Sequence, residues 1–174
     1  MENIDLDTLL ERNAIKKQIK EFLFNFGSTK QKGIFLYGEN AVGKTTFIKN
    51  LLKDDFNMIY LNSFDSRNKL KIEEFKGKNM TTQSVMSSFF KKKKPLVIVI
   101  DDIETMNSGD KGGINNLVKI LKSKKQEDGL RNPIICINNY FSDKKTNDLK
   151  KNLINIELKK PTDDEIEKIV RILF

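Results

Sequence analysis

Eight consecutive residues in the first third of the chain have the composition and spacing of a phosphate-binding loop. Residues 38–45 read Gly-Glu-Asn-Ala-Val-Gly-Lys-Thr, which matches G-x-x-x-x-G-K-[S/T] in full. The glycines let the backbone curl so that successive N–H groups point at phosphate oxygens. A helix that begins near Lys44 adds the positive end of its dipole. We therefore predict a nucleoside triphosphate site in which Lys44 reaches the β- and γ-phosphates and Thr45 offers its hydroxyl to Mg²⁺. The phosphate-binding candidates are Gly38, Glu39, Asn40, Ala41, Val42, Gly43, Lys44, Thr45 and Thr46.

Two consecutive aspartates follow a strongly apolar run. Residues 96–100 read Leu-Val-Ile-Val-Ile, and Asp101 and Asp102 come directly after them. A buried strand here would deliver Asp101 to the carboxyl edge of a parallel sheet, where open α/β sheets bind their ligands. We expect Asp101 to hold Mg²⁺ through its water shell and Asp102 to orient or deprotonate the attacking water. A strand ending in ordinary acidic turn residues is the alternative, and the phosphate-binding loop argues against it.

A third candidate is the amide pair Asn138-Asn139, which follows the apolar run 134–137. If this run is the strand beside the phosphate-binding loop, an amide at its end can contact the γ-phosphate or the lytic water. Asn-Asn is also a common turn sequence. Both interpretations stay open.

These candidates require a sheet whose strands end at one edge. Five short apolar runs predict strands, and the first four read as strands buried on both faces of a parallel sheet. Helical patterns lie between them; the clearest is an i, i+3, i+4, i+7 apolar stripe in residues 114–121. Strands that alternate with helices indicate βαβ units. The predicted strands are 33–37, 58–61, 96–100, 134–137 and 153–158.

The composition indicates a single globular α/β domain. A chain of 174 residues can bury one real core. It has no run of eighteen apolar residues that would predict a membrane helix, and its acidic first residues do not resemble a signal peptide. The one cysteine, Cys136, lies inside an apolar run, so we expect a buried core residue and a reducing, intracellular compartment. The net charge of +8 comes mainly from lysine; it reflects either genome composition or a partner with a phosphate backbone.

The end of the chain predicts one more helix. Residues 162–165, Thr-Asp-Asp-Glu, form a capping box directly after Pro161. An apolar stripe follows, formed by Ile166, Ile169, Val170 and Leu173. We expect this helix either to dock on the sheet domain or to be the first helix of a further domain.

Several stretches resemble those of the sliding-clamp loaders. Residues 62–69, Asn-Ser-Phe-Asp-Ser-Arg-Asn-Lys, resemble the Asn-Ala-Ser-Asp-Thr-Arg stretch of that family. Residues 110–117 are similar to the Gly-Gly-Ile helix start of the replication factor C large subunit, and residues 133–139 are similar to its sensor-1 strand. Together with the phosphate-binding loop and Asp101-Asp102, these stretches follow the family's order over about residues 4–174. The chain thus resembles an AAA+ ATPase, in particular the AAA+ core of the replication factor C large subunit.

The resemblance implies a fold and a site. The fold is a P-loop NTPase of the RecA-like AAA+ type, with three α/β/α layers and a five-stranded, mainly parallel sheet in the order 5-1-4-3-2. Residues 1–160 would form the nucleotide-binding core, and residues 161–174 the start of a truncated or missing helical lid. The implied cofactors are ATP and Mg²⁺. By position, Lys44 and Thr45 match the Walker A residues, Asp101 the metal-binding Asp and Asn139 the sensor-1 Asn. Residues 10–15 resemble the segment that lies over the adenine.

The resemblance also implies partners. A clamp loader is a hetero-oligomer that opens a ring-shaped sliding clamp and places it on primer–template DNA, in the nucleus or wherever replication occurs. The helix over residues 114–121 would face the duplex and contact the DNA backbone without reading bases. The DNA-binding candidates off its apolar face are Lys111, Lys119 and Lys122, and a solvated lysine face is the open alternative. The lysine run 91–94 is predicted to be a solvated loop at the opposite edge of the sheet.

The chain departs from the family at two catalytic positions. Asp102 stands where the family usually has Glu, and its side chain is one methylene shorter, which predicts slow hydrolysis. Residues 150–152 read Lys-Lys-Asn where small loader subunits have Ser-Arg-Cys. No arginine occurs between residues 132 and 170, so we expect no arginine finger, as in large subunits.

Three hypotheses remain. The first is an active ATPase subunit in which Lys44, Asp102 and Asn139 are catalytic. The second is a structural subunit that binds ATP, holds an assembly in register and hydrolyses little. The third is another AAA+ protein of DNA replication, such as an initiator or helicase loader; the stretches at residues 62–67 and 112–114 argue against it.

Overall fold

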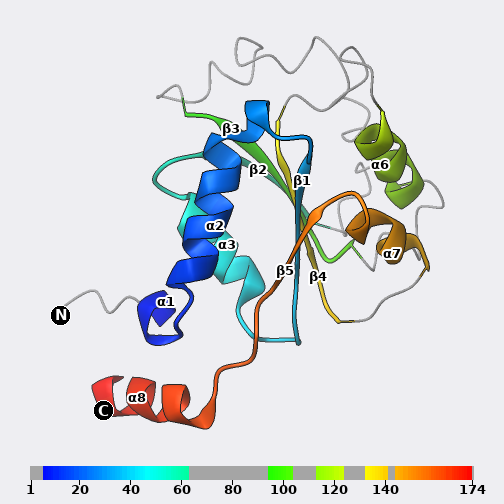
Figure 1. The fold of residues 1–174 in the computed structure, drawn as a ribbon. Helices are drawn as coiled ribbons and strands as arrows, with labels where there is room; N and C mark the ends of the chain where they lie inside the picture. Colours follow the sequence, from blue (N-terminus) through cyan, green and yellow to red (C-terminus); the bar gives the residue numbers. More distant parts are fainter. Residues whose placement is uncertain (1–5, 63–93, 104–112, 124–131, 141–143, 174) are drawn as a thin grey trace.

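The computed structural model describes residues 6–62, 94–103, 113–123, 132–140 and 144–173 (Figure 1). Its centre is a five-stranded parallel sheet in the order β2-β3-β4-β1-β5. Counted from the β5 edge, the same order reads 5-1-4-3-2. The strands are β1 (Gly33–Tyr37), β2 (Asn57–Asn62), β3 (Leu96–Asp101), β4 (Ile134–Asn138) and β5 (Ile154–Glu157).

Helices cover both faces of the sheet, so the predicted three-layer fold is confirmed (Figure 1). The helices α2 (Asn13–Phe24) and α3 (Lys44–Leu52) lie on one face, and α6 (Gly113–Lys122) and α7 (Lys144–Lys150) lie on the other. Alternate strand residues supply two separate apolar cores. The remaining described elements are α1 (Leu6–Leu9), the 3-10 turn η1 (Phe26–Ser28) and α8 (Asp163–Leu173).

Strand β1 illustrates how one strand serves both cores. Ile34 and Leu36 belong to the core under α2 and α3, whereas Phe35 belongs to the core under α6 and α7. All three side chains are fully buried. Successive side chains of a strand point to opposite faces of the sheet, so a continuous apolar run supplies both cores when both faces are covered. Cys136 on β4 is also fully buried and unpaired, as predicted.

The predicted stripe of α6 faces its core. Ile114, Leu117 and Leu121 are buried and Val118 is half-buried, whereas Lys119 and Lys122 are exposed. The Nζ of Lys32 donates to the carbonyl oxygens of two residues at the end of this helix, Ile120 at 3.3 Å and Ser123. A cation there interacts favourably with the negative end of the helix dipole. Lys111 lies outside the described residues.

The capping box of α8 is confirmed. The backbone N–H of Glu165 donates to Thr162 Oγ1 at 3.3 Å, and the backbone N–H of Thr162 donates to Glu165 Oε2 at 2.7 Å. The helix lies apart from the sheet, beside α1 (Figure 1). Ile166 and Val170 of the predicted stripe are 43% and 49% exposed, so the described part of the chain leaves much of this stripe uncovered.

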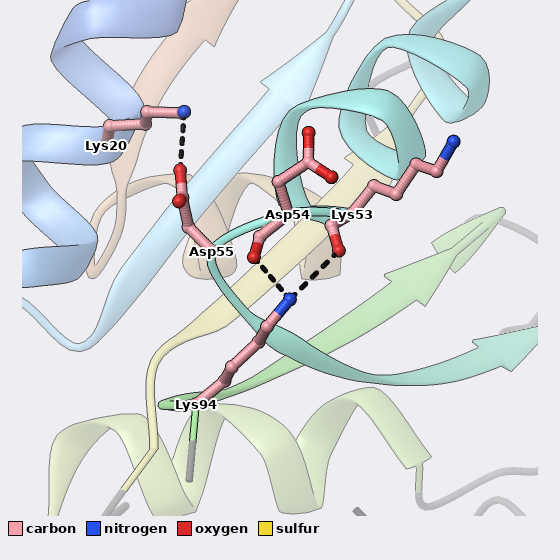
Figure 2. Close-up of polar contacts among 5 residues, drawn as sticks. All are labelled: Lys20, Lys53, Asp54, Asp55 and Lys94. Carbon is pink, nitrogen blue, oxygen red and sulfur yellow. Dashed lines mark hydrogen bonds and ion pairs between the residues drawn. The ribbon is translucent and has the colours of Figure 1, made fainter. Parts of the chain in front are cut away.

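The turn that follows α3 is held from two sides (Figure 2). Lys20 of α2 forms an ion pair with Asp55 at 2.6 Å. Lys94 donates from its Nζ to the carbonyl oxygens of Lys53, at 3.4 Å, and Asp54. Lys94 of the expected solvated loop at residues 91–94 is a half-exposed loop residue, and its Nζ donates to carbonyl oxygens that follow α3. Residues 91–93 lie outside the described residues.

None of the helices in the described ranges is long and apolar enough to cross a membrane.

Candidate functional site

The loop between β1 and α3 has the curled backbone that the sequence predicts. Gly43 precedes the first residue of α3 and has φ +85°, and Ala41 has φ +62°. Gly38 lies so close to β5 that a Cβ atom there would stand 2.3 Å from the carbonyl oxygen of Leu158. Glycine is therefore required at residue 38 by close packing and favoured at residue 43 by conformation. A left-handed alanine is uncommon and costs on the order of 1 kcal/mol.

The side chain of Lys44 contacts the backbone of this loop. Its side chain is buried, and its Nζ donates to the carbonyl oxygens of Gly38 at 3.1 Å and Glu39 at 2.6 Å. The same Nζ donates to Asn139 Oδ1 at 2.9 Å. A buried ammonium needs such oxygen acceptors because leaving water is costly. The ends of β1 and β4 thus bring together Lys44 and Asn139, two of the three predicted catalytic residues.

Asp101 is the centre of a second group of polar contacts. Thr45 Oγ1 donates to Asp101 Oδ2 at 2.7 Å, so the two predicted metal-binding residues lie together. The backbone N–H of Asp102 donates to Asp101 Oδ1 at 3.0 Å. Asp101 is only 4% exposed.

This pair fits Mg²⁺ by the chemistry of its donors. Carboxylate and hydroxyl oxygens suit Mg²⁺, which usually takes one or two protein oxygens together with water and substrate phosphates. The described residues contain no group of three or more His, Cys, Asp or Glu side chains that would form a metal site made of protein alone. An ion held by Thr45 and Asp101 would take further ligands from water and from substrate phosphates.

Asp102 directly follows β3 and has an unusual backbone conformation. Its φ is +51°, in the left-handed region, and it is half-exposed. Aspartate tolerates this conformation better than most residues. Its part in water activation stays a prediction.

Tyr60 on β2 is a site residue that no motif in the sequence predicts. Its hydroxyl donates to Asp101 Oδ2 at 2.6 Å. Burial raises the pKa of this phenol, and the hydrogen bond to Asp101 raises it further. The sequence offers one indication of this position: side chains alternate along β2, so Met58, Tyr60 and Asn62 share a face.

Arg12 is the second missed residue. Its Nη2 donates to the carbonyl oxygen of Val42 in the phosphate-binding loop at 2.9 Å, and its guanidinium lies 5.9 Å from the ring centroid of Phe47. Asp7 approaches Arg12 Nη1 at 4.0 Å. Burial lowers the pKa of Arg12, while Asp7 and Glu165 raise it. Nothing in the local sequence predicts a contact between residues 12 and 42.

Two hollows share Leu10, Arg12 and Pro161 among their lining residues, and one of them is lined by the phosphate-binding loop. One is bounded by residues 10–12, Ile15 and the segment that follows β5. The other is bounded by the loop and the first turn of α3. The stretch at residues 10–15, expected to cover the adenine, thus faces a hollow beside the phosphate-binding loop.

The predicted DNA-binding lysines lie away from the phosphate-binding loop. Lys119 and Lys122 belong to α6, on the sheet face opposite α3. Residues 63–69 and 110–112, which carried much of the resemblance to clamp loaders, lie outside the described residues.

This fold and site define a class of nucleotide-binding protein, and comparison with known families agrees. Residues 34–161 match the family described as "ATPase family associated with various cellular activities (AAA)". The chain belongs to this AAA family of ATPases.

Curated relatives carry the name that the sequence resemblance predicted. The replication factor C large subunit of Methanococcus maripaludis is 31% identical over 137 residues, which are 77% of this chain and 26% of that protein. Replication factor C subunit 1 of Schizosaccharomyces pombe is 30% identical over 138 residues, which are 75% of this chain and 14% of that protein. The chain therefore spans about a quarter or less of the length of these relatives.

Solved structures support the fold alone. The ORC2 protein of Aeropyrum pernix matches with a TM-score of 0.58 and 14% identity, over 92% of this chain and 50% of that chain. A structure of PCH-2 from C. elegans matches with a TM-score of 0.50 and 18% identity, over 99% of this chain and 52% of that chain.

The Arg12 contact generates a stability prediction. We expect Arg12→Met to lower the free energy of unfolding by about 1–3 kcal/mol, because it removes a buried, charge-assisted hydrogen bond to Val42. The matched control is Arg171→Met, which removes an exposed i, i+4 ion pair with Glu167 and should change stability by about 0.5 kcal/mol or less. Urea denaturation of both variants measures the difference, and equal losses would show that Arg12 does not brace the loop.

Proposed function

We propose that this chain is the ATP-binding AAA+ module of a DNA-polymerase sliding-clamp loader. In this role it would couple ATP binding and hydrolysis to clamp opening and to loading on primer–template DNA. The observation that carries the proposal is the joint placement of Lys44, Thr45, Asp101 and Asn139 at one sheet edge. The names of the relatives support the choice of a clamp loader among AAA ATPases.

Binding of ATP would replace the present contacts of Lys44. Its ammonium now satisfies carbonyl oxygens of its own loop, and phosphate oxygens are stronger, charged acceptors in the same reach. The N–H groups of the curled loop and the start of α3 would hold the β- and γ-phosphates. Exchange of neutral for anionic acceptors supplies part of the binding free energy.

Thr45 and Asp101 would hold Mg²⁺ beside the phosphates. The chemistry that such an ion would supply is neutralisation of the charge that develops on the phosphates during phosphoryl transfer. Asp102 would orient or deprotonate the attacking water. Asn139, which contacts Lys44, would sense the γ-phosphate.

A second candidate function is a nucleotide-binding structural subunit that hydrolyses little. The observation in its favour is Asp102, whose side chain is short for a catalytic carboxylate in this family. A different AAA+ ATPase of DNA replication is the third candidate.

The partners and domain limits belong to the same proposal. The partners would be other loader subunits, the sliding clamp and the DNA backbone, with Lys111, Lys119 and Lys122 as phosphate contacts. Residues 1–160 would form the core, and α8 would begin a helical lid. The protein would act at sites of DNA replication, in the nucleus where there is one.

The direct test of nucleotide binding is Lys44→Ala. We expect the Kd for a fluorescent ATP analogue to rise about 10- to 100-fold, because each hydrogen bond to a charged group contributes about 1.5–3 kcal/mol. Lys53→Ala is the matched control, since the Lys53 side chain is exposed at the other end of the same helix. The affinity of this variant for the ATP analogue should not change. An unchanged Kd for Lys44→Ala would overturn the assignment of the phosphate site.

Asp102→Glu tests whether hydrolysis is limited by the shorter carboxylate. We expect slow ATP turnover by the native chain and a gain of at least about tenfold in kcat for the variant, since a well-placed general base contributes 10²–10⁴-fold. Asp164→Glu, an exposed change in α8, is the control. Turnover is measured with and without primed DNA and clamp. Fast native turnover with no gain for Asp102→Glu would exclude the structural-subunit candidate.

A further inference from the structure

Tyr60 reaches the metal-binding aspartate from the neighbouring strand. In the parallel pairing of β2 and β3, Tyr60 lies opposite Val99, and Asn62 lies opposite Asp101. Side chains alternate along a strand, so Val99 and Asp101 share a face. The Tyr60 ring lies on that face, packed against the core beneath α2 and α3, and extends toward the carboxyl end of β3. Its hydroxyl reaches Asp101 Oδ2 at 2.6 Å.

The carboxylate of Asp101 is held by donors on both oxygens. Oδ2 accepts the hydroxyl of Tyr60 at 2.6 Å and that of Thr45 at 2.7 Å. Oδ1 accepts the backbone N–H of Asp102 at 3.0 Å. The Thr45 and Asp102 donors come from the residues predicted to act on Mg²⁺ and water. Tyr60 is the donor from outside that group, and it restricts rotation of the carboxylate about its χ2 torsion.

The Tyr60 ring is itself held in place. The Nζ of Lys49 on α3 lies 4.2 Å from the ring centroid, within the range of a cation–π contact. Met58 and Tyr60 both pack against the buried cluster on this face of the sheet. A ring fixed between α3 and β3 can hold its hydroxyl, and with it Asp101, in one position.

We propose that Tyr60 is a positioning residue that orients the Asp101 carboxylate toward the Mg²⁺ of a bound nucleotide. This inference rests on the proposed function, because it assumes a metal ion at Thr45 and Asp101. In this role Tyr60 would act through Asp101 and would not bind the metal itself. In the simpler alternative, the hydrogen bond to Asp101 only satisfies the hydroxyl of a half-buried tyrosine. The two roles predict different effects on metal binding.

The difference appears in how strongly Mg²⁺ tightens ATP binding. Loss of the Tyr60 hydroxyl frees the Asp101 carboxylate to rotate, so the metal-dependent part of the affinity should fall. The affinity for ATP without metal depends on Lys44 and the phosphate-binding loop. The hydrogen bond of Tyr60 goes to Asp101, so this metal-free affinity should stay unchanged. A purely structural role would alter stability and leave the ratio of the two affinities as it was.

The test compares ATP affinity in Mg²⁺ with ATP affinity in EDTA for Tyr60→Phe. We expect the ratio of these affinities to fall about tenfold, the effect of one hydrogen bond to a charged group. Tyr140→Phe is the matched control, because it removes another tyrosine-to-carboxylate hydrogen bond, to Glu157, and should keep the native ratio. Thr45→Val is the reference for loss of a metal ligand.

The outcomes separate this inference from the proposed function. A native ratio in Tyr60→Phe, with a reduced ratio in Thr45→Val, would overturn the role of Tyr60 and leave the metal site standing. A native protein that binds ATP equally in Mg²⁺ and EDTA would overturn the proposed metal site and this inference with it. A fall in the ratio for both Tyr60→Phe and Tyr140→Phe would assign the effect to general loosening and also overturn the inference.

Discussion

The site depends on one buried ammonium group at the carboxyl edge of the sheet. Lys44 is only 8% exposed, and its Nζ is satisfied by two carbonyl oxygens of its own loop and by the amide of Asn139. A buried cation without such acceptors would be strongly destabilising. The curl of the loop and the adjacency of β1 and β4 are both needed to provide them. Strand order and loop conformation are thus linked through a single side chain.

Helix α3, which begins with Lys44, is braced at both ends. At its amino end Arg12 donates to Val42 in the preceding loop. At its carboxyl end Lys94 caps carbonyl groups, and Lys20 pairs with Asp55 (Figure 2). Contacts from α2 and from the entry to β3 therefore limit how far this helix can move. A rigid element suits a site that must place a cation and a hydroxyl within tenths of an ångström.

The fold and the centre of the site could be predicted because their signals are local. The glycine spacing of residues 38–45 requires the curl that the structure shows, and the apolar run before Asp101 predicts a buried strand ending at that residue. Short apolar runs rich in β-branched residues likewise predicted the strands, within a residue or two at their ends. The family resemblance then supplied the strand order that places Lys44 beside Asn139.

The residues that were missed act across the fold. Tyr60 contacts Asp101 because β2 pairs with β3 in one particular register. The spacing of residues in the sequence does not predict that register. Arg12 and Lys94 likewise bind backbone carbonyls, which carry no sequence signature at all. The lysine run at 91–94 was predicted to be a solvated loop from its place before β3, and that prediction could not include the hydrogen bonds of Lys94 to the carbonyl oxygens that follow α3.

The most direct test of the account is a crystal structure of this chain with a non-hydrolysable ATP analogue and Mg²⁺. We expect Lys44 Nζ to leave the carbonyl oxygens of Gly38 and Glu39 for the β- and γ-phosphates. We also expect Thr45 Oγ1 to be a ligand of the metal, with Asp101 bound to the metal's water shell. An analogue bound elsewhere, or phosphates that leave Lys44 on its present carbonyl partners, would contradict it.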